Sequence, residues 1–221
     1  MTRSGASNPL AAGVEPLPES QLEAAGRLAA RAHVADPCFA YLFPDPATRS
    51  RTLESLMCWL VRRGHVYGQV TRTAGSLDGV SVVIPSAEIA GLSEDEQDAA
   101  TDYPRAEREI EPDALQRLFT EFWGRIFLQA HVALVDHLDD GYWELDLLAV
   151  ETTRQGQGVG STLMRHLNQR ADLAGAQVGL ITVNPRNPPF YERHGYTVVA
   201  EAIDDPSGIH WWSMRRLPLT R

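Results

Sequence analysis

The sequence is poor in cysteine and in basic charge. Cys38 and Cys58 are its two cysteines among 221 residues, too few for a disulfide scaffold or a cysteine-based structural zinc site. Lys and Arg together number 20 against 29 Asp and Glu, which gives a formal net charge of −9. Nucleic acid binding rests on basic side chains that neutralise phosphates. We therefore expect no nucleic acid partner and a reducing, cytoplasmic setting.

Long apolar runs and metal-ligand patterns are also missing. No stretch approaches the roughly 18 consecutive apolar residues of a membrane span, and the N-terminus lacks the basic segment and apolar run of a secretory signal. The seven histidines keep no metal-ligand spacing, and His131 and His137 are six positions apart. We therefore expect neither a membrane partner nor a bound metal.

The remaining composition is that of an ordinary globular protein, since 43% of the residues are hydrophobic and 22% are charged. Residues 1–18, rich in Ala, Ser, Gly and Pro, are expected to form a loose leader with room for one short strand. Residues 19–221 are then a single domain. Both a monomer and a homodimer remain open.

Periodicity predicts helices first and strands after them. Ser20, with Glu23 three residues later, forms a capping-box pattern that predicts a helix start. A second helix is expected over 46–63, where apolar residues keep helical spacing. The runs 65–73 and 79–84 have strand character and predict a hairpin.

The middle of the chain combines an acidic cluster with an amphipathic segment. The cluster at 94–98 is expected to be a solvated helix face or loop without chemistry. Residues 113–135 place apolar side chains at spacings of three and four, which predicts a long helix packed on a sheet. The strand expected next, 142–150, is apolar enough to be central.

A glycine-rich loop follows this strand directly, with glycines at 156, 158 and 160, and a helix opens after it. Such a turn aims backbone N–H groups and the helix dipole at one point, which suits a pyrophosphate. No Gly-Lys-Ser/Thr follows, and the third glycine comes two residues after the second, so the Walker and dinucleotide patterns are excluded. By itself, a glycine turn could still be only a tight connection.

The run Gln155-Gly156-Gln157-Gly158-Val159-Gly160 matches the Q/R-x-x-G-x-G/A loop of the GCN5-related N-acetyltransferase (GNAT) superfamily, and Asn184 to Tyr196 resembles that family's Asn…Tyr-Glu-Lys/Arg-x-Gly-Phe/Tyr segment. The resemblance covers 142–216. Segment 36–45 and the end of the chain are similar to the branch that contains puromycin N-acetyltransferase.

The resemblance implies a GNAT fold of the α/β (α+β) class, with a mixed, mostly antiparallel sheet of about six to seven strands and helices on both faces. A splayed strand pair would hold acetyl-CoA as co-substrate. The residues implied to contact it are Leu148, Ala149, Val150, Gln155, Gly156, Gln157, Gly158, Val159, Gly160, Ser161, Asn184, Asn187 and Tyr191. Either amide side chain, that of Asn184 or that of Asn187, could meet CoA.

Acetyl transfer to an amine needs a base for the amine and an acid for the departing thiolate. The resemblance implies that Tyr191 is the acid and places Glu144 in the register of a glutamate base. Asp146 is its rival, because strand alternation puts both carboxylates on one face. Deprotonation through ordered water is a third route.

These expectations define a leading function and two alternatives. The leading hypothesis is an acetyl-CoA-dependent N-acetyltransferase that acetylates a small-molecule amine by direct attack in a ternary complex. The first alternative makes a protein N-terminus or lysine the acceptor. The second is a non-catalytic acyl-CoA-binding module, which would lack a working acid and base. The identity of the amine cannot be inferred, because relatives share the CoA machinery and differ in the pocket.

Overall fold

The computed structural model of the chain describes residues 13–93, 96 and 110–219. Most of the expected leader and, Glu96 apart, the acidic cluster at 94–98 lie outside these residues. Of the leader, Val14–Pro16 forms β1, the edge strand of the sheet. No helix of the described part is both long and apolar enough to cross a membrane.

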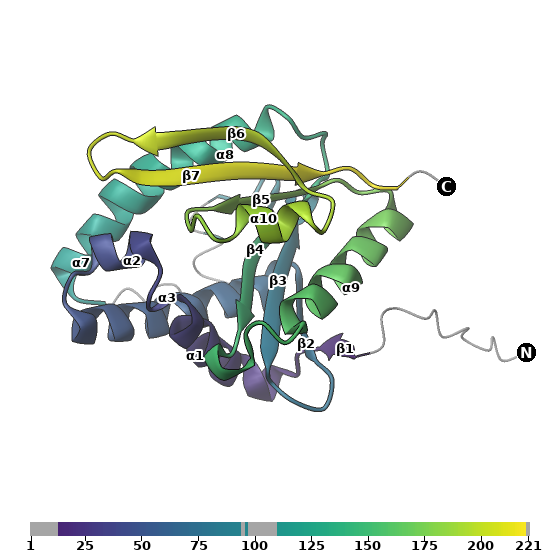
Figure 1. Cartoon of the computed structure of the whole chain (residues 1–221), viewed down its shortest axis with the longest axis horizontal. Helices are drawn as coiled ribbons and strands as arrows, with labels where there is room; N and C mark the ends of the chain where they lie inside the picture. Colours follow the sequence, from purple (N-terminus) through teal and green to yellow (C-terminus); the bar gives the residue numbers. More distant parts are fainter. Residues whose placement is uncertain (1–12, 94–95, 97–109, 220–221) are drawn as a thin grey trace, which may run out of the picture.

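The chain forms one seven-stranded sheet in the order β1-β2-β3-β4-β5-β7-β6 (Figure 1). Neighbouring strands are antiparallel except β4 and β5, which are parallel. The expected mixed, mostly antiparallel sheet is therefore confirmed. The remaining strands are β2 (Gln69–Thr73), β3 (Gly79–Pro85), β4 (Trp143–Val150), β5 (Val178–Thr182), β6 (Thr197–Asp204) and β7 (Ile209–Arg216).

Strands β4 and β5 separate almost as soon as they meet. Their pairing consists of Trp143 with Val178 and Glu144 with Gly179, although β4 runs on to Val150. In Figure 1, β3 and β4 run steeply down the view, whereas β5, β7 and β6 cross it. Two half-sheets thus diverge from one short parallel contact, as the expected splay requires.

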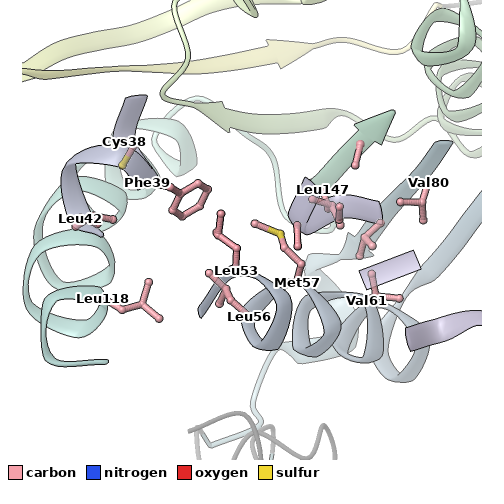
Figure 2. Close-up of a cluster of buried hydrophobic side chains, with 14 of the residues drawn as sticks. Cys38, Phe39, Leu42, Leu53, Leu56, Met57, Val61, Val80, Leu118 and Leu147 are labelled. Carbon is pink, nitrogen blue, oxygen red and sulfur yellow. The ribbon is translucent and has the colours of Figure 1, made fainter. Parts of the chain in front are cut away.

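One face of the sheet is covered by most of the helices and carries the larger core cluster (Figure 2). Leu53, Met57 and Val61 of α3 lie in this cluster with Val80 of β3 and Leu147 of β4. The segments on this face are η1 (Glu19–Gln21), α1 (Leu22–His33), α2 (Pro37–Leu42), α3 (Pro46–Tyr67), α7 (Pro112–Arg117), η2 (Leu118–Phe127) and α8 (Leu128–Val135).

The opposite face is covered by α9 (Val159–Ala174) and α10 (Pro188–Glu192). Met164 and Leu167 of α9 form a second cluster there with Leu180, Tyr191 and Met214. The short segments α4 (Ser86–Ile89) and η3 (Thr152–Arg154) follow β3 and β4. Helices therefore lie on both faces, as expected.

The predicted helix starting at Ser20 and the predicted strand starting at His65 are both wrong at their boundaries. Residues 19–21 form a 3-10 turn, and α1 begins after Gln21 without a side-chain cap. Helix α3 continues to Tyr67, because Gly64 packs against Val82 and the Gly68 N–H donates to the Gly64 carbonyl at 3.0 Å. Tertiary packing outweighs the strand preference of this segment.

The long helix expected over 113–135 exists, but it is not α-helical throughout. Its central ten residues, η2, form a π-helix between α7 and α8. A Cβ on Gly124 would lie 2.7 Å from the Phe119 carbonyl oxygen. Spacing alone does not distinguish the two kinds of turn, because both place residues three to five apart on one face.

Helices α1 and α3 approach each other at a glycine. A Cβ on Gly26 would lie 2.4 Å from Cys58 Sγ, 2.6 Å from its Cα and 2.8 Å from its N. Two of these atoms belong to the backbone, so they cannot move without shifting α3. Glycine at position 26 therefore sets the distance between the two helices.

Gly26→Ala should destabilise the fold by overpacking, at a cost of about 1–3 kcal/mol, which for a domain of this size lowers Tm by roughly 2–4 °C per kcal/mol. Thermal unfolding followed by circular dichroism measures the change. The control is Arg27→Ala on the exposed side of the same helix, which should leave Tm almost unchanged. An unaltered Tm for Gly26→Ala would contradict the close packing.

Candidate active site

The glycine loop joins β4 to α9 through two left-handed residues. Gly156 has φ 74° and Gly158, the N-cap of α9, has φ 84°. Side chains other than glycine rarely adopt these angles. No side chain caps the N-terminus of α9, and the positions where a Cβ would stand on both glycines are open. The N-terminus of α9 therefore has no side-chain cap and no obstruction at these two glycines, which fits a phosphate group.

The two glutamines of the loop hold its shape. Gln155 Nε2 donates to the Val150 carbonyl at 3.2 Å, and Gln157 Nε2 donates to the Thr153 carbonyl at 2.9 Å. Both side chains are exposed and turn back onto the backbone. Because both glutamine side chains are occupied in this way, the backbone amides of the loop are the groups that can bind an anion.

The third glycine has a packing role. A Cβ on Gly160 would lie 3.3 Å from the Phe190 ring and 3.5 Å from a methyl group of Val150. On the next residue, Ser161 Oγ lies 3.1 Å from His194 Nε2, within hydrogen-bonding distance. Val159, the first residue of α9, packs beside Gly79 of β3. These contacts seat the first turn of α9 on the end of the sheet.

Strand β4 has one paired edge and one open edge. Leu148, Ala149 and Val150 pair with β3, but within the described residues β5 pairs with β4 only as far as Glu144. The backbone facing β5 beyond that point needs partners from outside the sheet. This edge leads from the middle of β4 directly to the glycine loop.

A β-bulge interrupts β4 at Asp146. Val82 pairs with Leu147 and Val83 pairs with Leu145, so Asp146 is the extra residue without a partner on β3. As a result, Leu145 packs in the core cluster under α9, whereas Leu147 packs in the cluster under α3. A bulge re-aims side chains in this way, and here it points Asp146 into a cavity.

That cavity has a volume of about 700 Å³ and passes between the two half-sheets. Its lining includes Leu145 to Leu148 of β4, Ile181 and Thr182 of β5, and Val183, the residue after β5. On one face it is walled by residues of α3 and η2, and on the other it reaches Asn187 and Tyr191. Two ligands that enter the cavity from opposite faces of the sheet can therefore meet inside it.

Tyr191 lies at the boundary between the cavity and the second core cluster. Its ring contacts Phe190 at a centroid distance of 5.3 Å and Tyr196 at 5.9 Å, and only 8% of the residue is exposed. Burial raises the pKa of Tyr191 above that of a free tyrosine. No described residue hydrogen-bonds its hydroxyl, which therefore stays protonated at neutral pH and available as a donor.

The two asparagines of the predicted site have different positions. Asn187 lines the cavity, and its Nδ2 donates to Thr182 Oγ1 at 2.8 Å. Asn184 Oδ1 instead accepts from the backbone N–H of Arg186 at 3.1 Å and shapes the turn after β5. Of the two, Asn187 is therefore the one that borders the cavity.

Glu144 and Asp146 both line the cavity, although the bulge interrupts the strand alternation from which this was expected. Arg63 of α3 forms an ion pair with Asp146. Burial raises the pKa of Asp146 to about 7, the charge of Glu144 adds to the rise, and Arg63 opposes it. The Glu144 carboxylate faces His131 of α8, with 3.7 Å between Oε1 and Nδ1, and raises the pKa of His131.

Several cavity residues escaped the sequence analysis. Arg63 and the aromatic residues of α3 and η2 belong to no motif, and helical spacing marks them as core. For His131 the sequence alone leaves two interpretations, a residue that faces the acceptor pocket from the predicted helix or a satisfied or surface histidine, and in the structure it lines the cavity. Their convergence on β4 depends on how the helices pack.

Comparison with known proteins agrees with this geometry. Residues 120–198 match the family model described as an acetyltransferase (GNAT) domain. The uncharacterized N-acetyltransferase YjcF of Bacillus subtilis (strain 168) is 33% identical over 64 residues, which are 29% of this chain and 46% of that protein. The match thus spans less than half the length of this curated relative.

Two solved structures share the fold over nearly the whole chain. The histone acetyltransferase HPA2 and related acetyltransferase of Corynebacterium glutamicum superimposes with a TM-score of 0.65 at 20% identity, over 95% of this chain and 97% of that one. The putative arylalkylamine N-acetyltransferase 7 of the yellow fever mosquito gives a TM-score of 0.61 at 16% identity, over 92% and 86%. Residues 120–198 thus match an acetyltransferase (GNAT) domain, and the chain as a whole shares the fold of these acetyltransferases.

Proposed function

We propose that this protein is an N-acetyltransferase that moves the acetyl group of acetyl-CoA to an amine of a small molecule, by direct attack in a ternary complex. The observation that carries the proposal is the cavity between β4 and β5, which joins the open edge of β4 to a pocket walled by helices. The end of the cavity at the open edge of β4 suits a CoA thioester, and the end walled by helices suits an amine.

The glycine loop and the open edge of β4 are the places for acetyl-CoA, which supplies an activated acetyl thioester. The N–H groups at the start of α9 and the left-handed turns at Gly156 and Gly158 fit its pyrophosphate. The open edge from Leu148 to Val150 would hydrogen-bond the pantetheine arm and orient the acetyl carbonyl. Asn187, on the cavity wall, would contact the same arm.

Tyr191 is suited to protonate the leaving sulfur. As the amine nitrogen bonds to the acetyl carbon, the carbon–sulfur bond breaks and the sulfur needs a proton. Tyr191 lines the cavity from the face opposite the helical wall, and its hydroxyl carries a proton at neutral pH, since burial raises its pKa further above the ordinary tyrosine value. It can therefore donate to the thiolate without first being protonated itself.

The proton of the amine goes to the carboxylates of β4. Glu144 and Asp146 lie in the same cavity, and Arg63 engages Asp146. This pairing leaves Glu144 as the carboxylate that receives the proton, directly or through a water, while Asp146 sets the charge around it. Oppositely placed acid and base groups are what direct attack requires.

The acceptor could instead be a protein terminus or a lysine, and the two solved relatives include one of each substrate type by their names. Here α3 and η2 wall the pocket beside β4, which favours a small molecule over an extended peptide. The non-catalytic module is the less favoured alternative, because Tyr191 and Glu144 line the same cavity.

Gly158→Val should weaken acetyl-CoA binding at least 100-fold. A β-branched residue is strained at φ 84°, and its side chain would occupy the open space beside the first turn of α9. Isothermal titration calorimetry with acetyl-CoA measures the affinity. Gly208→Val is the matched control, because Gly208 has φ 69° in the β6–β7 turn. Equal affinities for both variants would contradict the phosphate site.

Tyr191→Phe should lower kcat by about 100-fold or more, the usual effect of losing a general acid, with acetyl-CoA affinity nearly unchanged. Release of free CoA is measured with a panel of small amines, and the products are weighed by mass spectrometry. The sequence contains 20 arginines and no lysine, so self-acetylation of side chains adds little background. Tyr41→Phe, on the surface, is the control.

Two results would overturn the enzyme proposal or its acid. Tight binding of acetyl-CoA without CoA release on any amine would favour the non-catalytic module. Normal turnover by Tyr191→Phe would remove Tyr191 from the chemistry while leaving the enzyme proposal intact.

The value of kcat/KM should rise with pH through about 7. Below that pH the buried Asp146 carboxyl holds a proton, because burial raises its pKa to about 7, and it no longer supplies the negative charge that helps Glu144 to take the proton of the amine. A pH profile of CoA release measures this rise. In Glu144→Gln the rate should fall at every pH, because the base is lost, and the rise that remains should move to lower pH, because the negative charge beside Asp146 is gone. A profile that falls between pH 6 and 8 would contradict this assignment.

A further inference from the structure

The wall of the cavity that faces β4 is built from aromatic rings. Trp59 of α3 contacts Trp123 of η2 edge to face, at 6.4 Å and 84°. Trp123 also contacts Phe122 and Phe127, each with centroids 4.9 Å apart, and Phe122 contacts Phe39 at 5.8 Å. All five residues line the cavity. The rings thus form one continuous apolar surface, which we call the aromatic wall.

The π-helix places most of this wall. Phe119, Trp123, Phe127 and His131 recur at every fourth position and all line the cavity. Leu118 and Ile126, on the neighbouring stripe, are fully buried in the core. One helix therefore serves two purposes: the stripe through Trp123 faces the cavity, and the neighbouring stripe packs in the core, although its Phe122 also lines the cavity. π-Helical turns are frequent where a helix meets a functional site.

The lining of the cavity as a whole carries more negative than positive charge. Arg63 is its permanent cation in the described residues, and it is engaged by Asp146. Glu144 has His131 as its ion-pair partner there, at a distance too long for a hydrogen bond. The charged or titratable lining residues are His33, Asp36, Arg63, His131, Glu144 and Asp146.

Glu144 is left without a permanent cation. His131 stacks on Phe127 at 5.6 Å and 16°, and its Nδ1 lacks a hydrogen-bond partner in the described part of the chain. When His131 is neutral, the carboxylate of Glu144 has no compensating charge. A ligand that brings one ammonium group would supply it.

We propose that the acceptor carries a single ammonium group on an aromatic or similarly flat apolar body. Glu144 receives the ammonium, and Trp59, Trp123 and Phe127 cover the body. This inference rests on the proposed function for its turnover but not for its binding.

The chemistry of the wall excludes the main alternatives. Rings favour flat apolar bodies through edge and face contacts. A polyamine or a lysine-rich peptide would bring a second ammonium group, for which the other two lining carboxylates are already engaged: Asp36 accepts from the Cys38 N–H and Asp146 pairs with Arg63. That second charge would lose hydration without an ion-pair partner. A neutral aromatic alcohol would leave Glu144 uncompensated.

Binding is measured by isothermal titration calorimetry at pH 8.5, with saturating CoA so that no reaction occurs. The ligands are 2-phenylethylamine, 2-phenylethanol, n-butylamine, spermidine and a short lysine-containing peptide. We expect 2-phenylethylamine to bind at least tenfold more tightly than each of the others. In parallel, CoA release from acetyl-CoA gives kcat/KM for each amine.

Two variants separate the parts of the site. Trp123→Leu should weaken the binding of 2-phenylethylamine at least tenfold and the binding of n-butylamine less than threefold. Glu144→Gln should make 2-phenylethylamine and 2-phenylethanol bind alike. Leu128→Ala, at a residue that is 51% exposed on α8, is the control and should match the wild type. If Trp123→Leu does not fold, the wild-type ligand series decides.

The outcomes distinguish this inference from the proposed function. A higher kcat/KM for spermidine or the peptide than for 2-phenylethylamine would overturn the substrate class and leave the acetyltransferase standing. Selective binding of 2-phenylethylamine without CoA release would support the ligand class and overturn the enzyme. Equal binding of amine and alcohol by the wild type would remove Glu144 from recognition.

Discussion

The separation of β4 from β5 after two paired residues is the constraint on which the rest of the structure depends. A parallel ladder would normally continue, and its loss leaves backbone donors and acceptors of β4 without strand partners. Those groups must find partners in water or in a ligand. The same separation opens the cavity and connects the two faces of the sheet. The binding edge, the reaction space and the access from both sides thus arise from a single break in pairing.

Local irregularities then determine which side chains enter that space. The bulge at Asp146 sends Leu145 and Leu147 to opposite core clusters and turns an acidic residue into the cavity. The π-helix η2 does the same on the facing wall, where it presents aromatic rings on one stripe and core residues on the next. Each irregularity interrupts the regular backbone hydrogen bonding and thereby redirects a few side chains.

Sequence reasoning was most successful where one short segment carries the information. The strand, glycine loop and helix around 150–160 follow from local patterns, and the structure has them in that order. Glu144 and Tyr191 were singled out by their register within a motif, and both line the cavity. Arg63 and the aromatic wall were missed, because their spacing is also that of ordinary helix cores. The predictions for the end of α3 and for the kind of helix in η2 were wrong for the same reason: both features depend on what the helix packs against.

The sequence by itself therefore determined the conformation of the glycine loop and the order of the elements. These are local properties, because allowed dihedral angles and side-chain periodicity act within a few residues. The tertiary structure alone decided that α3, η2 and β4 meet around one cavity, that Asp146 pairs with Arg63, and that Glu144 faces His131. These contacts are between residues far apart in the sequence, and Arg63 and Asp146 are separated by more than 80 positions. Only the packing of the whole domain brings such residues together.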